Sequence, residues 1–174
     1  AVLPAKAEAL VAGSASGPVE LVASVNGTPF RVLAESISRE RIFGDASIRI
    51  FGRGRNAVLA APYAPVMTFS NIEGRTARQL MDDALTVNGI PLGWTVDWGL
   101  TDWNIPANAF AQQGSWIDAL TAIAGAAGGY LIPHPSARSI RVRHRYPVAP
   151  WEWGTVTPDF VLPVDAVARE SLRW

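Results

Sequence analysis

Apolar and polar residues alternate along the first third of the chain, and this period of two predicts β-strands. Residues 19–25 and 30–33 show the alternation on either side of Asn26 and Gly27. An Asn-Gly pair readily adopts positive φ at both turn positions, so these residues predict a tight β-hairpin. Residues 1–18 are mostly small, with Gly and Ser repeated near their end, and predict a flexible N-terminal segment.

Two further strands are predicted after the hairpin, at residues 35–43 and 46–51. Ile48 and Ile50 alternate with polar neighbours, which indicates a strand that is buried on one face. Residues 52–56, Gly-Arg-Gly-Arg-Asn, are expected to form a turn that ends this β meander.

From residue 71 the apolar period changes to 3.6 residues, which predicts helices. Thr76 followed by Gln79 is a capping box, and Ser115 followed by Asp118 caps a second helix in the same way. Short strands are expected around these helices at residues 94–98, 103–105, 130–132 and 139–146.

This order of patterns predicts an α+β fold. β-Barrel or sandwich-like segments at the N- and C-terminal ends are expected to flank an inserted two-helix α/β domain. Residues 19–70 and 148–174 would share the β-rich domain, and residues 71–147 would form the inserted domain.

The composition favours association with other proteins. Of the 174 residues, 49% are hydrophobic and only 17% are charged, and the formal net charge is zero. A neutral chain has no long-range field that would concentrate nucleic acid or anionic lipid. No apolar run approaches the roughly 18 residues of a membrane span, so we expect no membrane anchor. The apolar surplus predicts an obligate interface.

Neither histidine lies in a recognisable catalytic motif. His134 lies between two prolines in a predicted turn, and His144 lies on a predicted strand among arginines. We expect both to be ordinary structural residues, and the chain not to be an enzyme. A hydrolase with an unfamiliar site remains a third hypothesis, which requires a histidine within hydrogen-bonding reach of a serine or a carboxylate.

Other candidate catalytic, phosphate-binding and metal-binding residues are no more convincing. Asp82 and Asp83 are neighbours on a helix and point about 100° apart, so they cannot share a proton. The Gly-Arg-Gly-Arg sequence at residues 52–55 lacks the Lys-Ser/Thr of a phosphate loop. The chain has no cysteine and no metal-ligand motif, so we expect neither a metal nor a cofactor.

The most suggestive pattern is a row of arginines in the last predicted hairpin. Arg141, Arg143 and Arg145 alternate with other residues, so their side chains would lie on one face of a strand. The plainest interpretation is a solvated face that protects a sheet edge. The alternatives are contact with nucleic acid or salt bridges across a subunit interface.

Seven tryptophans are many for this length. Trp94 and Trp98 have the same strand parity, as do Trp151 and Trp153, so each pair is expected to face one side. Packing in a core or an interface is the favoured interpretation. We therefore name Arg141, Arg143, Arg145, Trp151 and Trp153 as candidate interface residues.

Residues 46–64, ASIRIFGRGRNAVLAAPYA, resemble the pattern of a strand, Gly-Arg and an apolar stretch in baseplate hub proteins of tailed phages and Mu-like prophages. The resemblance continues through TARQL at residues 76–80, SWIDALTAIAGAAGGYL at residues 115–131 and RVRHRYP at residues 141–147. It covers residues 19–174 through loose patterns of fold, and it indicates a fragment or short form of a hub.

The resemblance implies a structural protein of the virion tail, assembled in the bacterial host cytoplasm. Its partners would be further copies of itself, forming a trimer around the tail axis, and the neighbouring tail tube and spike proteins. DNA would at most pass through a lumen. The alternative function is a carbohydrate- or cell-wall-binding module that uses Trp-rich loops.

Overall fold

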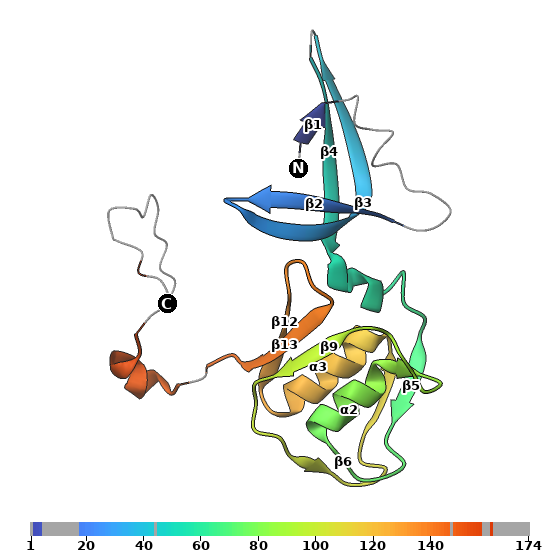
Figure 1. Ribbon diagram of the computed structural model, residues 1–174, viewed down its shortest axis with the longest axis vertical. Coiled ribbons are helices and arrows are strands. Elements are labelled where there is room, and N and C mark those ends of the chain that lie inside the picture. The colour runs from blue at the N-terminus through green and yellow to red at the C-terminus, as the bar shows by residue number, and fades with distance from the viewer. Residues whose placement is uncertain (1, 5–17, 44, 147, 158–160, 162–174) are drawn as a thin grey trace, which may run out of the picture.

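The computed structural model describes residues 2–4, 18–43, 45–146, 148–157 and 161. An N-terminal β-sheet lies at one end of the molecule and an α/β unit at the other, and a short C-terminal segment stands apart from both (Figure 1). Mixed α and β structure agrees with the predicted α+β class.

The N-terminal sheet has four antiparallel strands in the order β1-β4-β3-β2. They are β1 (Val2–Pro4), β2 (Val19–Val25), β3 (Thr28–Ile42) and β4 (Asp45–Gly54). Asn26 has φ 50° and Gly27 has φ 82°, so the turn between β2 and β3 has the expected conformation and the hairpin is confirmed.

β3 is one strand of 15 residues, where the sequence predicted two. A bulge between Ala34 and Ser36 shifts the register and accommodates the extra residue without ending the strand. β4 continues through Gly54, so the predicted turn at residues 52–56 is wrong. The chain instead enters a 3₁₀ helix, η2 (Arg55–Leu59), directly from the strand.

The sheet encloses a small apolar cluster and stays open. Ala34, Ile48 and Ile50 are its buried members, which confirms the half-buried strand predicted around the two isoleucines. The four strands do not close into a barrel in the described part of the chain. Residues 148–157 form a 3₁₀ helix, η3 (Pro150–Thr155), and add no strand to this sheet. Residues 158–160 and 162–174 lie outside the described residues, so their place in a shared β-rich domain stays a prediction.

Two capped helices form the centre of the α/β unit, as predicted. The capping box of Thr76 and Gln79 begins α2 (Ala77–Ala84), and that of Ser115 and Asp118 begins α3 (Trp116–Ala126). Both helices bury their apolar faces in the main core of the molecule, because each presents aliphatic residues at helical spacing. The largest fully buried side chains of this core are Leu59, Met81, Leu120, Ile123, Ile140 and Val142.

Short sheets surround the two helices. A three-stranded sheet has the order β12-β13-β9, and three strand pairs join β5 to β11, β6 to β10 and β7 to β8. The bounds are β5 (Met67–Ser70), β6 (Arg75–Thr76), β7 (Thr86–Val87), β8 (Ile90–Pro91), β9 (Thr95–Trp98), β10 (Asn104–Ile105), β11 (Ala111–Gly114), β12 (Gly129–Pro133) and β13 (Ser139–His144). The predicted hairpin of β12 and β13 is confirmed.

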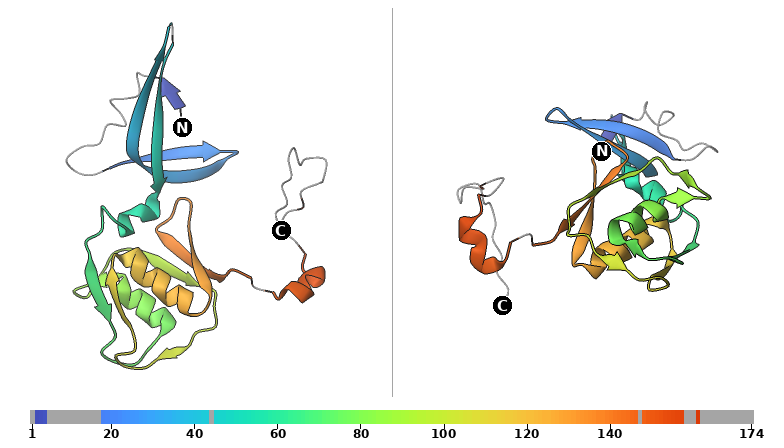
Figure 2. Two further views of the ribbon diagram at one scale, coloured as in Figure 1. Left: turned by 180° about the vertical axis from the view of Figure 1, so that it is seen from behind. Right: turned by 60° about the horizontal axis from the view of Figure 1, so that its bottom comes forward.

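The turn between β12 and β13 contacts the N-terminal sheet. The N–H of Arg31 donates to the carbonyl oxygen of Pro135 at 2.8 Å, and Arg55 Nη1 donates to the carbonyl oxygen of Ser136 at 3.1 Å. Beyond β13 the chain leads away to η3, which is separate from the sheet and from the α/β unit in both further views (Figure 2).

Candidate interaction surfaces

The arginine row lies on the central strand of its sheet. β13 pairs antiparallel with β12 on one side and parallel with β9 on the other, so it is not an edge strand. The prediction that the arginines protect a sheet edge is therefore wrong. The predicted alternation is correct within the strand, since Ile140 and Val142 are fully buried while Arg141 and Arg143 are half-buried.

Arg143 is bound within its own chain. Its Nη2 lies 2.6 Å from Asp97 Oδ2, and its Nη1 donates to the carbonyl oxygen of Asp97 at 2.9 Å. A Cβ on Gly99 would lie 2.4 Å from Arg143 Nη1, so the glycine provides the space that the guanidinium occupies. Arg143 thus joins β13 to β9, and a subunit salt bridge would have to compete with Asp97.

The other two arginines differ from Arg143. The Nε of Arg141 is buried without a hydrogen-bond partner in the described part of the chain. Arg145 follows the end of β13 and is exposed. The structure therefore does not present the three side chains as one uniform surface.

Four of the tryptophans pack against the main core. Trp94, just before β9, and Trp98, at its end, pack on the same core side, as their parity predicted, and Trp98 contacts Trp103 with ring centroids 5.8 Å apart. Trp116 packs against the same core from the start of α3. Because these four side chains pack against the core, only the remaining tryptophans are candidates for stacking on a sugar.

Trp151 and Trp153 are the exposed pair, with 85% and 55% of their surfaces accessible. Both lie on η3, where residues two apart do not share a face, so the predicted strand parity of this pair is wrong. Trp153 Nε1 donates to the carbonyl oxygen of Val148 at 3.1 Å, which folds its ring back on the segment. Trp151 has no such bond to any described residue, and its ring projects from the helix. Trp174 lies outside the described residues.

The two histidines have different surroundings. His134 Nδ1 accepts hydrogen bonds from the N–H groups of Ser136 at 3.2 Å and Ala137 at 2.9 Å, so the imidazole organises the turn between β12 and β13. His144 is exposed at the end of β13. No hydrogen bond joins either ring to a serine hydroxyl or a carboxylate among the described residues.

The remaining sequence candidates have structural contacts. Arg53 binds the Glu35 carboxylate at 2.6 Å, and this hydrogen bond holds the pKa of Glu35 below its usual range. Arg55 binds Glu20 at 3.1 Å, so both arginines of the 52–55 sequence form ion pairs within the chain. Burial raises the pKa of Asp82.

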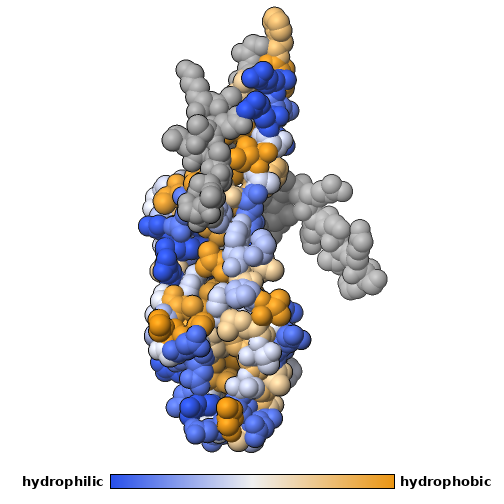
Figure 3. Space-filling view, turned by 90° about the vertical axis from the view of Figure 1, so that its right-hand side faces the viewer, coloured by the Kyte–Doolittle hydropathy of each residue, from blue (hydrophilic) through white to orange (hydrophobic). Residues whose placement is uncertain are grey.

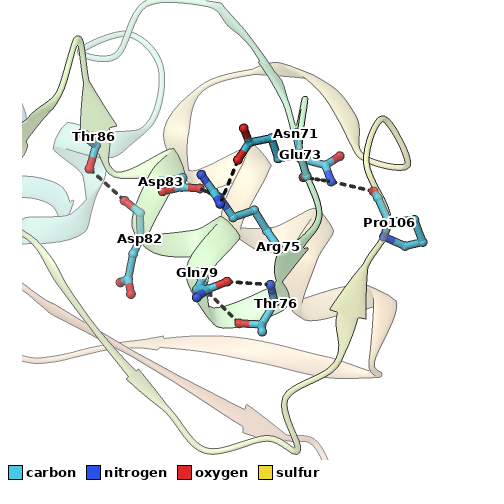
Figure 4. Close-up of polar contacts among 9 residues, drawn as sticks. All are labelled: Asn71, Glu73, Arg75, Thr76, Gln79, Asp82, Asp83, Thr86 and Pro106. Carbon is cyan, nitrogen blue, oxygen red and sulfur yellow. Dashed lines mark hydrogen bonds and ion pairs between the residues drawn. The ribbon is translucent and has the colours of Figure 1, made fainter.

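A hollow of about 330 Å³ lies beside α2 and was not predicted. Figure 4 shows Arg75 between two carboxylates, with Nε 3.0 Å from Asp83 and Nη1 3.5 Å from Glu73. Buried Asn71 supports this rim, since its Nδ2 donates to the carbonyl oxygens of Pro106 at 2.7 Å and Glu73 at 3.0 Å. Asn71 lies outside any turn motif, so the sequence alone did not indicate this role. The charges of Arg75, Glu73 and Asp83 pair with one another within the chain.

A second hollow, of about 410 Å³, lies where the N-terminal sheet meets the β12–β13 turn. We call it the junction groove. Phe30 on β3, Pro133 at the end of β12 and Pro135 on the turn give it apolar walls, and Arg31 and Arg55 line it as well. The sequence could not indicate it, because its walls come from segments about 100 residues apart.

Apolar side chains are also exposed elsewhere. Figure 3 shows apolar residues mixed with hydrophilic ones over one face, with apolar colour at the upper end of the molecule. There the β3–β4 hairpin carries Ile42 and Phe43, which are 67% and 106% exposed.

No helix in the described part is long and apolar enough to cross a bilayer. The described residues also contain no group of three or more acidic or histidine side chains that could hold a metal ion.

Comparisons with known proteins concern the fold. No protein-family model matches the chain, and no curated protein matches it. Among solved structures, the chain is similar to the tail protein from Neisseria meningitidis MC58, with 17% sequence identity and a TM-score of 0.52. The similarity covers 71% of this chain and 38% of that protein, so the chain spans well under half of its neighbour's length. The predicted resemblance to tail proteins is thus confirmed at the level of the fold.

Proposed function

We propose that this chain is a structural module of a phage or prophage tail that acts by association and without turnover. The similarity of its fold to that of a tail protein carries the proposal. The more specific role is that of a baseplate hub component, which assembles as a trimer around the tail axis and connects the tail tube to the spike or tip. It would then be part of the virion tail, assembled in the bacterial host cytoplasm.

The surface of the molecule supports association. A neutral chain does not repel its own copies, and a tryptophan that is 85% exposed in an isolated chain is typical of an interface anchor. Arg145, Trp151 and Trp153 are exposed and Arg141 is half-buried, so these candidate interface residues keep side-chain surface for a partner, whereas Arg143 is held by Asp97. DNA would at most pass through the lumen of such an assembly.

Sedimentation velocity from about 1 to 300 µM tests the proposal. We expect a concentration-dependent closed oligomer, with a trimer as the main species, and rings in electron micrographs of the same samples. A protein that stays strictly monomeric at the highest concentration would overturn the assembly claim. A closed oligomer other than a trimer would overturn the threefold hub and retain the assembly role.

Trp151 and Trp153 also keep the carbohydrate-binding alternative open, because both are exposed on one short helix. A glycan array that includes cell-wall fragments separates the two functions. Glycan binding that is lost in Trp151→Ala would favour the alternative. An array without hits, together with a closed oligomer, would support the structural role.

A further inference from the structure

The junction groove has an excess of positive charge. Arg31 Nη1 and Arg55 Nε bind the two carboxylate oxygens of one residue, Glu20. The charge of Arg138 also acts on this carboxylate. Two guanidinium groups therefore contact a single acid in the groove, and the Arg31 side chain remains 41% exposed. An acidic group that entered the groove would meet uncompensated positive charge.

The apolar walls of the groove suit an aromatic side chain. Phe30 is 38% exposed beside the prolines of the turn, and flat rings pack well against proline and phenylalanine surfaces. The hydrogen bond between the Arg31 N–H and the Pro135 oxygen fixes the turn against β3, so the walls are already formed. A preformed apolar pocket loses little entropy when it is filled.

The η3 segment has the complementary features. Trp151 projects from it, and Glu152 is the only charged residue among residues 148–157. The segment is ordered by its own contacts, since Trp153 Nε1 donates to the backbone carbonyl oxygen of Val148 and the Thr155 hydroxyl donates to the backbone carbonyl oxygen of Glu152 at 2.7 Å. It therefore presents the indole of Trp151, the more exposed of its two tryptophans, next to one carboxylate.

We propose that Trp151 of one copy inserts into the junction groove of a second copy and that Glu152 lies against Arg31 and Arg55. Both features belong to one chain, yet η3 stands apart from the sheet and the α/β unit in all three ribbon views, so the groove of its own chain is not filled by it (Figures 1 and 2). Each copy donates one segment and accepts one, which is a head-to-tail contact that closes a ring when the rotation permits. The inference rests on the proposed assembly function and names the contact that would drive it.

The first test is the substitution Trp151→Ala, measured by sedimentation equilibrium on the full chain. We expect association to weaken by at least about tenfold, because an aromatic anchor in a pocket carries much of an interface's free energy. Ile72→Ala is the matched control. Ile72 is 81% exposed beside the hollow at Arg75, so its loss should leave association unchanged.

A mixing experiment identifies the two halves of the contact. Phe30→Glu removes an aromatic wall and sets a carboxylate against Glu152, so this variant keeps the inserting segment but loses the groove. We expect it to associate as weakly as Trp151→Ala, so that each variant alone is monomeric at the concentration used. An equimolar mixture of the two should form a heterodimer, because one intact segment then meets one intact groove. Urea midpoints like that of the unsubstituted chain show that both variants fold.

The outcomes separate this inference from the proposed function. If the unsubstituted chain forms a closed oligomer that Trp151→Ala leaves intact, the inserted contact is wrong and the assembly role stands. If the mixture forms no heterodimer although each variant is folded and monomeric, the pairing of Trp151 with the groove is wrong. If the unsubstituted chain is strictly monomeric, both proposals fail.

Discussion

A Cβ on Gly52 would lie 1.7 Å from the backbone oxygen of Leu33. The two strands approach this closely beside the bulge between Ala34 and Ser36, where β3 carries its extra residue. Backbone cannot yield as a flexible side chain can, so the position admits no side chain without a change in register. The glycine thus permits the continuous β3–β4 hairpin and does not mark a turn.

We therefore expect Gly52→Ala to lower the free energy of unfolding by about 3 kcal/mol, or to abolish folding of the sheet. Urea denaturation followed by circular dichroism measures this. Gly54→Ala is the matched control, because a Cβ there meets only Asn56 Oδ1, at 3.1 Å. A loss below about 0.5 kcal/mol at Gly52 would contradict the close approach of the two strands.

The N-terminus of α3 gives a second prediction. The Asp118 carboxylate accepts hydrogen bonds from the N–H of Ser115 at 2.8 Å and from its hydroxyl at 2.7 Å. Ser115→Ala removes the hydroxyl at a buried position and should cost about 1 kcal/mol of stability. Thr76→Ala at the exposed start of α2 should cost less, since water can replace the lost bond. Equal losses in urea denaturation at the two caps would contradict this difference.

Both caps were predictable from the sequence because their contacts lie within three residues. The same holds for the Asn26-Gly27 turn, because the two residues that adopt positive φ are the ones that favour it. Local chemistry therefore predicted the helix starts and the first hairpin correctly. It also predicted that Trp94 and Trp98 face a common side, since parity needs no partner strand.

Contacts between distant segments were not predictable in this way. β11 has the sequence Ala-Gln-Gln-Gly, which carries no alternating pattern, and it becomes a strand only by pairing with β5. Likewise, the central position of β13 depends on its parallel partner β9. The arginine row was therefore placed at a sheet edge, and the Asp97 partner of Arg143 was missed. The junction groove arises from the same kind of long-range contact.

The ion pair between Arg143 and Asp97 can be measured directly. Both side chains are partly exposed, at 36% and 50%, so we expect a coupling free energy of about 0.5 kcal/mol. A double-mutant cycle with Arg143→Ala, Asp97→Ala and the double variant gives this value from urea denaturation. The coupling should be independent of protein concentration, because the pair lies within one chain. A coupling that appears only at high concentration would place Arg143 in a subunit contact instead.

The ionisation of Glu20 predicts how the stability of the protein depends on pH. The hydrogen bond from Arg31, followed by the charges of Arg55 and Arg138, lowers the pKa of this carboxyl from its ordinary value of 4.5. A carboxyl with a lowered folded pKa stabilises the protein above its unfolded pKa and loses that contribution as the pH falls through the folded value. Stability should therefore decrease as the pH falls below about 4.5.

Glu20→Gln isolates this contribution. The amide cannot ionise, so the variant should be less stable than the unsubstituted chain at pH 7, and the difference should shrink toward pH 2 to 3. Urea midpoints at pH steps across this range provide the measurement. Glu40→Gln is the control, since its contact with Arg49 at 3.6 Å is longer and solvent-exposed, and it should give a flatter difference. A difference that stays constant from pH 7 to pH 2 would mean that the Glu20 charge does not hold Arg31 and Arg55 at the junction.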